Sequence, residues 1–205
     1  MIRLFALIIF LLSAKAHATR FDSLSFGLSA GLPFSEIKNP DSTTAYYSGL
    51  SLTGRGNFPL YSSEQFSTSL VGSLRYLDLK NTANNSTQSE IAQYLGPGVG
   101  MQFSLLKFVL GAEYYLMLAR HYTVGTNSEQ LNYQMMTLNY YLGYRVELGA
   151  RAALAFSWSQ ASGRVPKKKT KFNSNSPYKD QVYWVHFIYF TGSSLSDFAK
   201  SLFRD

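Results

Sequence analysis

The feature that most constrains the fold is a strict alternation of apolar and polar residues, clearest in TLNYYLGYRVELGARAALAFSW at residues 137–158. The apolar positions are Leu138, Tyr140, Leu142, Tyr144 and Val146, and the residues between them are Asn139, Tyr141, Gly143, Arg145 and Glu147. Successive side chains of a β-strand point to opposite faces. The pattern therefore predicts a sheet with one apolar face and one small, polar or charged face.

Alternating runs recur along the chain and predict eight strands, at residues 23–35, 45–58, 65–79, 90–103, 108–120, 133–147, 151–160 and 180–191. The connections alternate in length: PLYSSE, SLLK and LGA are short, whereas NTANNSTQSE and HYTVGTNSEQLN are long and polar. Short turns at one end and long loops at the other are typical of bacterial outer-membrane barrels. We therefore predict an all-β fold, an eight-stranded antiparallel up-and-down transmembrane β-barrel over residues 19–191.

Turn lengths give a prediction of register. A three-residue turn at residues 148–150 would pair Glu147 with Arg151, and a four-residue turn at residues 104–107 would pair Phe103 with Phe108. Directly paired residues share a face of the sheet, so both turns keep the apolar faces in phase.

The first 18 residues have the parts of a secretory signal peptide. Arg3 gives the positive region, residues 4–12 the apolar region, and Ala16-His17-Ala18 a cleavage site before Thr19. No later segment reaches 18 consecutive apolar residues, so no transmembrane helix is expected. The chain has no cysteine, which excludes disulfides and thiol chemistry.

Two barrel types fit the strands: a lipid-embedded barrel, and a soluble ligand-carrying barrel of lipocalin type with apolar residues inside. The less apolar face of the first strand carries Ser23, Ser25, Gly27, Ser29 and Gly31. Small residues suit the crowded lumen of a narrow barrel better than a solvated surface. The charged fraction of 15% is also below the usual quarter, which favours the lipid-embedded barrel.

Aromatic residues cluster near both ends of the predicted strands, as expected where strands cross the membrane interfaces. Those near the long loops are Tyr46, Tyr47, Tyr76, Trp158, Tyr183 and Trp184, and those near the short turns are Phe58, Phe66, Phe103, Phe108 and Tyr189. The alternative is that Tyr and Phe are simply good strand formers.

With these strands, loops and the aromatic-rich final strand QVYWVHFIYF, residues 23–191 resemble the small eight-stranded outer-membrane β-barrel proteins of the OmpA-barrel and OmpX type. The resemblance implies the outer membrane of a Gram-negative bacterium, with both termini periplasmic and outer-membrane lipid and lipopolysaccharide as partners. It also implies insertion by the outer-membrane assembly machinery, with Phe190 as the aromatic end of the assembly signal. The chain departs from the family by continuing 15 residues past Phe190.

Six charged residues take the phase that points into the lumen, since a lipid-facing Arg near the bilayer midplane costs about 2–4 kcal/mol. They are Arg55, Glu113, Arg145, Glu147 and Arg151 near the short turns, and Arg75 higher up. We expect a charge network that fills the lumen, with Glu113 and Arg145 on neighbouring strands as its first pair. The alternative is the charged constriction of a narrow pore.

The predicted loop at residues 161–179 is strongly basic and contains no acid before the final strand: Arg164, Lys167, Lys168, Lys169, Lys171 and Lys179. At a cell surface it would face lipopolysaccharide phosphates or another anionic partner. No nucleic-acid-binding module accompanies it, so no nucleic-acid partner is expected. A solvated loop is the alternative.

Past the last strand, residues 192–205 predict a short amphipathic periplasmic helix, with apolar residues at helical spacing at Leu195, Phe198, Ala199, Leu202 and Phe203. It could lie on the membrane interface or close the barrel's mouth, and a frayed tail is the alternative.

The predicted function is a monomeric barrel with a structural or surface-interaction role through its extracellular loops. A narrow pore for ions or small solutes is the second candidate, and a lipid A-modifying enzyme the third. Enzymatic activity is not expected: His121, with Thr123 and Glu129 nearby, has no complete catalytic set, and His186 sits in the final strand without a neighbouring Ser. No cofactor is expected, and two distant histidines without cysteine give no metal site.

Overall fold

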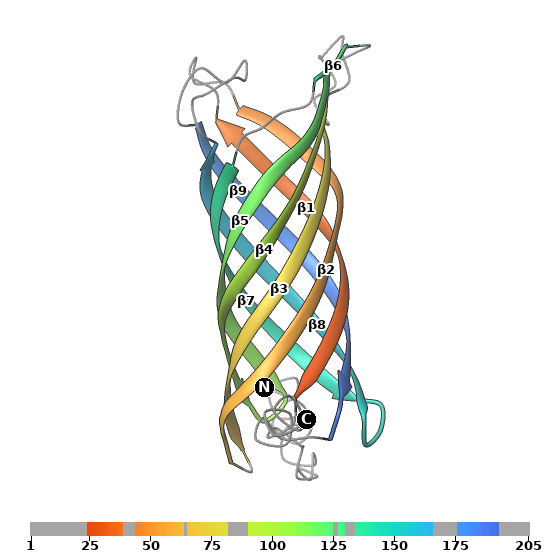
Figure 1. The fold of residues 1–205 in the computed structure, drawn as a ribbon. Helices are drawn as coiled ribbons and strands as arrows, with labels where there is room; N and C mark the ends of the chain where they lie inside the picture. Colours follow the sequence, from red (N-terminus) through yellow and green to blue (C-terminus); the bar gives the residue numbers. More distant parts are fainter. Residues whose placement is uncertain are drawn as a thin grey trace, which may run out of the picture.

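A computed structural model describes residues 24–38, 44–63, 65–81, 90–124, 127–129, 134–165 and 176–192. Its long strands form one antiparallel sheet that closes on itself, because β1 pairs with both β2 and β9, and β4 pairs with β5 (Figure 1). The long strands are β1 (Ser25–Lys38), β2 (Thr44–Ser62), β3 (Phe66–Asn81), β4 (Glu90–Leu105), β5 (Phe108–Val124), β7 (Gln134–Glu147), β8 (Ala152–Val165) and β9 (Ser176–Phe190). The short β6 (Asn127–Glu129) pairs antiparallel with the end of β5. The prediction of an eight-stranded antiparallel barrel is confirmed.

The predicted segments at both ends of the chain lie outside this description. They are the signal peptide at residues 1–18 and nearly all of the C-terminal helix at residues 192–205, of which only Gly192 is described. In the described ranges, no helix is both long and apolar enough to cross a membrane.

The two predicted turn registers are wrong, although both keep the predicted phase. Leu105 pairs with Phe108, so the β4–β5 turn has two residues, and Leu106 adopts a positive φ of 53° there. At the β7–β8 turn Glu147 pairs with Ala153 and not with Arg151. In each turn the partner of a given residue lies two positions from the predicted partner. Because side chains alternate between faces, a shift of two residues leaves every side chain on the predicted face.

The strands extend beyond the predicted ends. β8 continues to Val165 and β9 begins at Ser176, so much of the predicted basic loop is part of the sheet. At the short-turn end, Pro59–Ser62 belongs to β2, with a bulge between Pro59 and Tyr61 that tolerates the proline. A strand crosses a membrane in about 9–11 residues, whereas these strands have 14–19, so their ends project past the apolar band.

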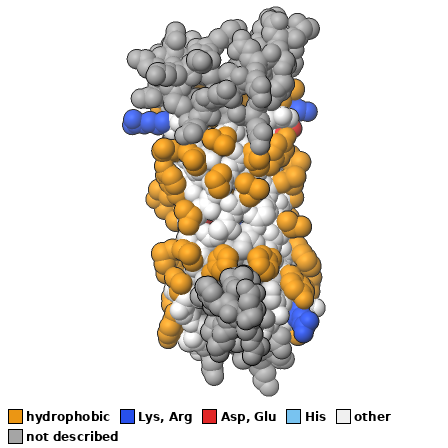
Figure 2. Space-filling model, in the orientation of Figure 1, with side chains coloured by type: hydrophobic (Ala, Val, Ile, Leu, Met, Phe, Trp, Pro, Cys, Tyr) orange, Lys and Arg blue, Asp and Glu red, His pale blue; other side chains and the backbone are white. Residues whose placement is uncertain are grey.

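The outer wall of the barrel is apolar. In β1 the side chains of Phe26, Leu28 and Leu32 are 51%, 72% and 59% exposed, while Ser25 and Ser29, in the opposite phase, are buried. Figure 2 shows hydrophobic side chains in a band around the visible face of the barrel. A soluble carrier barrel has the reverse arrangement, so the lipocalin-type alternative is wrong and the wall is suited to lipid.

The aromatic positions follow the predicted belts with two exceptions. Tyr46, Trp158 and Tyr183 are exposed on the outer wall near the long loops, but Tyr47 and Trp184 are buried inside the barrel. Each buried ring takes the opposite phase from the exposed neighbour beside it in sequence. Placement near a strand end therefore predicts a belt residue only together with the phase.

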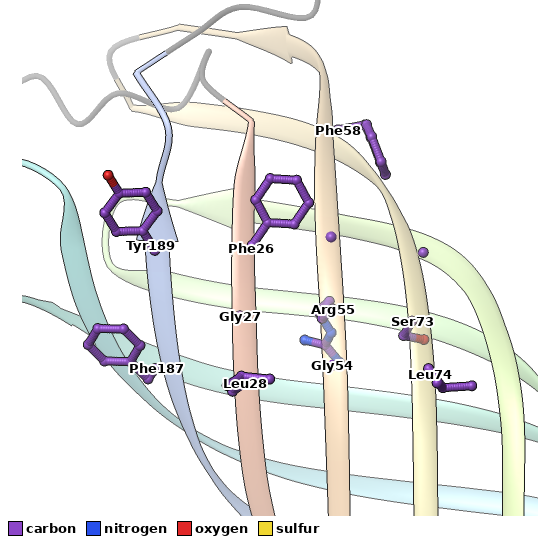
Figure 3. A pocket seen from close by; sticks show the side chains of 12 residues that line it. Phe26, Gly27, Leu28, Gly54, Arg55, Phe58, Ser73, Leu74, Phe187 and Tyr189 are labelled. Atoms are coloured by element: carbon purple, nitrogen blue, oxygen red, sulfur yellow. The ribbon is translucent and has the colours of Figure 1, made fainter. Parts of the chain in front are cut away.

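A hollow of about 670 Å³ lies in the outer wall, at the short-turn half of β1, β2, β3 and β9 (Figure 3). Its floor includes Gly54, Gly56 and Gly72, where other outward positions carry Leu or Phe. A Cβ built at Gly54 or Gly72 would approach no atom closer than 4.0 or 3.9 Å, so neither glycine is required by local packing. The residues around the hollow are Phe26, Leu28, Phe58, Leu74, Phe187 and Tyr189.

Candidate functional site

The candidate site is the interior of the barrel, which has two layers of different character. The layer toward the long loops is apolar and buried, and consists of Ile37, Tyr47, Leu77, Leu79, Ala92, Tyr94, Tyr115, Met117, Met135 and Tyr178. These residues come from β1, β2, β3, β4, β5, β7 and β9, so the layer reaches across the lumen. Below it, toward the short turns, the lumen-facing side chains are mainly charged, polar or small.

An ion pair between Arg75 of β3 and Asp180 of β9 lies next to the apolar layer. Arg75 Nη2 is 2.7 Å from Asp180 Oδ2, and the exposed fractions of the two side chains are 2% and 0%. Ser35 donates a 3.0 Å hydrogen bond to the other carboxylate oxygen, and Arg75 Nε donates one of 2.9 Å to Ser51. The guanidinium also lies 5.3 Å from the Trp184 ring. Both charges are thus fully enclosed and held from several strands.

A second ion pair joins Arg55 of β2 to Glu113 of β5. Glu113 also accepts hydrogen bonds on Oε2 from the Tyr115 hydroxyl and, at 2.9 Å, from Ser73. The Arg55 guanidinium stacks 4.7 Å from the centre of the Tyr141 ring. Glu113 is completely buried, so this pair stabilises the interior only as a complete set of partners.

The predicted Glu113–Arg145 pair is wrong. Glu113 lies opposite Asn139 in the β5–β7 ladder, and Arg145 is six residues further along β7, or about 20 Å at strand rise. Arg145 is instead buried near the short-turn end, with its guanidinium 5.7 Å from the Phe190 ring. Neighbouring strands bring two residues together only when the register also matches.

Two of the predicted network residues lie at the barrel's rim. Glu147 shares the phase of Arg145 and acts on it electrostatically, but its side chain is exposed. Arg151 is exposed in the β7–β8 turn, because that turn is longer than predicted. The prediction that Glu147 and Arg151 belong to the enclosed network is therefore wrong, whereas Arg55, Arg75, Glu113 and Arg145 lie in the interior.

Two interior residues were missed, Asp180 and His186. The expectation that His186 has no neighbouring Ser is wrong, because Ser29 Oγ lies 2.6 Å from Nδ1 and Ser157 Oγ lies 2.6 Å from Nε2. Ser29 is on β1 and Ser157 on β8, the two strands that flank β9. A signal was available: Asp180 and His186 share one face of β9, and the cost of a polar group against lipid turns that face inward.

The residues of the predicted basic loop divide into two groups. Arg164 in β8 and Lys179 in β9 are exposed strand residues, opposite Pro177 and Ser162 respectively. Lys167, Lys168, Lys169 and Lys171 lie outside the described residues.

The residues considered for a lipid A-modifying enzyme, His121, Thr123 and Glu129, are described by their backbones only. The backbones of His121, Thr123 and Glu129 lie in the paired strands β5 and β6, with Tyr122 opposite Glu129. Their side chains lie outside the description. Within the described part of the chain, no group of three or more His, Cys, Asp or Glu is placed to hold a metal ion.

No family model and no curated protein matches the chain. Solved structures do: Neisserial surface protein A covers 78% of this chain and 95% of its own at 13% identity, with a TM-score of 0.46. Ail, the attachment invasion locus protein of Yersinia pestis, solved with the heparin analogue sucrose octasulfate, covers 81% and 99% at 13% identity, with a TM-score of 0.43. OprG, an outer-membrane protein of Pseudomonas aeruginosa, covers 84% and 98% at 13% identity, with a TM-score of 0.38.

Proposed function

We propose that the protein is a monomeric outer-membrane barrel of a Gram-negative bacterium, acting through its long-loop end in a structural or surface-interaction role. The observation that supports this proposal is the filled interior. Glu113 and Asp180 are 0% exposed, and an apolar layer lies between them and the long loops. A lumen closed in this way leaves the outer surface and the loops to contact other molecules.

The proposed orientation places the short turns and both termini in the periplasm and the long loops outside the cell. Insertion by the outer-membrane assembly machinery through the final strand, with Phe190 as its aromatic end, belongs to the same proposal. Pairing of Ser25 with Phe190 supports this proposal, because the described start of the barrel lies beside its described end.

The proposed partner at the outer surface is lipopolysaccharide. Lys80, Arg164 and Lys179 are exposed on the strand ends near the long loops. Figure 2 shows Lys and Arg side chains at the boundary between the hydrophobic band and the loop end. Cations at that level suit phosphate groups while the band below contacts acyl chains, and each cation near a charged membrane contributes about 1 kcal/mol.

Binding of the refolded protein to lipopolysaccharide in liposomes tests this partner. We expect Arg164→Gln and Lys179→Gln each to weaken binding about fivefold at low salt, since each removes one cation. Arg151→Gln is the matched control, because Arg151 is equally exposed but lies at the short-turn end. Equal affinities for all four proteins would contradict a role for these cations.

Conductance in planar bilayers separates the filled barrel from a narrow pore. We expect no discrete openings from the wild-type protein, because the apolar layer excludes water and ions. Openings whose selectivity changes in Glu113→Ala would instead identify a constriction and replace the proposal.

We also propose that the protein is not an enzyme, so the mass spectrum of lipid A should be the same in cells with and without the gene.

A further inference from the structure

A pocket lies in the outer wall near the long loops, between β1, β2, β8 and β9. Its volume is about 650 Å³, which is within the range of about 300–1,000 Å³ that is common for small-molecule sites. The side chains that face it from the outer wall include Phe34, Glu36, Tyr46, Gln160, Lys179 and Gln181. All six are exposed, because they take the phase opposite to the buried residues beside them.

The strand register arranges these six residues in two adjacent rows across the wall. One row is Tyr46, Glu36 and Lys179, and the next is Phe34, Gln181 and Gln160. The following row, toward the short turns, holds Leu32, Tyr183 and Trp158, which are exposed residues of the apolar wall. The pocket therefore begins where the apolar band ends, at the level where the polar heads of surrounding lipids would lie.

The pocket combines an aromatic ring with hydrogen-bonding groups of both kinds. The ring of Phe34 packs edge-to-face against Tyr183, with the centroids 6.3 Å apart, and it is still 53% exposed. The amides of Gln160 and Gln181 each donate and accept hydrogen bonds. A pyranose sugar matches this combination, because it has C–H groups on its ring faces and hydroxyl groups around its edge. The negative face of an aromatic ring attracts such C–H groups.

The charges in the pocket balance each other. Glu36 and Lys179 are direct partners in the β1–β9 ladder, and they are the two charged side chains among the described residues that line the pocket. A phosphate group is bound best by several cations and donors, whereas a carboxylate repels it. Together with the two glutamine amides, the balanced pair suits neutral hydroxyl groups better than phosphate.

We propose that this pocket binds one pyranose unit of the lipopolysaccharide in the surrounding leaflet. The inference rests on the proposed function, since it takes lipopolysaccharide as the partner, and it adds which part of that molecule is recognised. The Phe34 ring contacts a C–H face of the sugar. Gln160, Gln181 and Glu36 form hydrogen bonds with its hydroxyl groups.

Calorimetry with the refolded protein in detergent micelles tests the proposal. The probe is the core oligosaccharide of lipopolysaccharide, freed of lipid A by mild acid and of phosphate by hydrofluoric acid. The wild-type protein should bind it, with little loss of affinity at high salt, because contacts to hydroxyl groups are screened less than contacts between charges. Binding of whole lipopolysaccharide in liposomes without binding of the oligosaccharide overturns the sugar site and leaves the proposed function standing. A protein that binds neither contradicts both.

Two pairs of variants connect the binding to the pocket. Gln181→Ala and Phe34→Leu should each weaken oligosaccharide binding about fivefold, through lost hydrogen bonds and a lost ring contact respectively. The matched controls are Gln93→Ala in β4 and Phe156→Leu in β8, which change outward-facing residues that do not line the pocket and should keep the wild-type affinity. Heat-dependent gel mobility checks that each variant is folded. Pocket variants that bind the oligosaccharide as tightly as their controls overturn the proposal, and the wild-type measurement decides it if a variant fails to fold.

Discussion

The long-loop half of the lumen and its short-turn half solve the same packing problem with different chemistry. Tyr, Leu and Met side chains fill the first half, whereas arginines, carboxylates and hydroxyl groups around a small cavity fill the second. The Leu and Met side chains of the apolar half depend on shape and volume, so they can be exchanged for others of similar size. The polar half depends on each group having its partner, so it tolerates single changes poorly.

The largest effect is expected where the halves meet, at Asp180. Asp180→Asn leaves the buried Arg75 charge uncompensated and should lower the free energy of unfolding by about 3–5 kcal/mol. Urea unfolding of the refolded protein in liposomes measures it. The double variant Arg75→Met/Asp180→Leu removes both charges and should regain most of that stability. A double variant as unstable as the single one would show that the pair has a role beyond charge balance.

A somewhat smaller effect is expected from Leu79→Ala in the apolar half. Leu79 is 0% exposed, and its truncation should cost about 2–4 kcal/mol through lost burial and the cavity left behind. Leu148→Ala is the control, because Leu148 is exposed in the β7–β8 turn and its truncation should cost under about 0.5 kcal/mol. The same unfolding experiment compares them, and similar losses would argue against a close-packed apolar layer.

In the polar half, a single neutral hydrogen bond should matter less. Ser157→Ala removes one hydrogen bond to His186 and should lower the free energy of unfolding by about 1 kcal/mol. Ser162→Ala, at an exposed position of the same strand, serves as its control. If the two serine variants unfold at the same urea concentration, the hydrogen bond to His186 makes no net contribution.

The smallest effects are expected at the rim of the polar half. Glu147→Gln and Arg151→Gln change exposed charges and should shift the free energy of unfolding by less than about 0.5 kcal/mol each. Urea midpoints at low and high salt measure the shift. A loss of 2 kcal/mol or more from either variant would extend the buried network to the rim and restore the original six-residue prediction.

The alternation of residues was sufficient to predict the number of strands, the closed architecture and the face on which most side chains lie. It could not predict the strand ends near the long loops, because QASGRV and SPYK carry polar residues on the outward face, Gln160, Ser162, Arg164 and Lys179, and are still paired in the ladder. Backbone hydrogen bonds continue where the apolar signal stops. For this reason Arg164 and Lys179 were predicted to lie in a loop, although they lie in β8 and β9.

The partners of the interior charges were beyond the sequence for a different reason. Arg75 and Asp180 lie on β3 and β9, and Arg55 and Glu113 on β2 and β5, so both pairs join strands that are not neighbours. Their meeting depends on the stagger of the closed barrel, which local spacing does not encode. The phase of His186 and Asp180 was within reach, because the rule applied to the arginines also turns these residues away from lipid.

Because of the hollow around Gly54, Gly56 and Gly72, the outer wall of the barrel is uneven. Hydrocarbon chains must enter this indentation to touch the backbone, while the ridges of Phe26, Phe58 and Tyr189 hold their neighbours further away. Lipids around the barrel therefore meet sectors of unequal depth. The outer wall is therefore asymmetric about the barrel axis. When two copies meet in the plane of the membrane, the rotation of each copy about its axis decides whether the hollow faces the other.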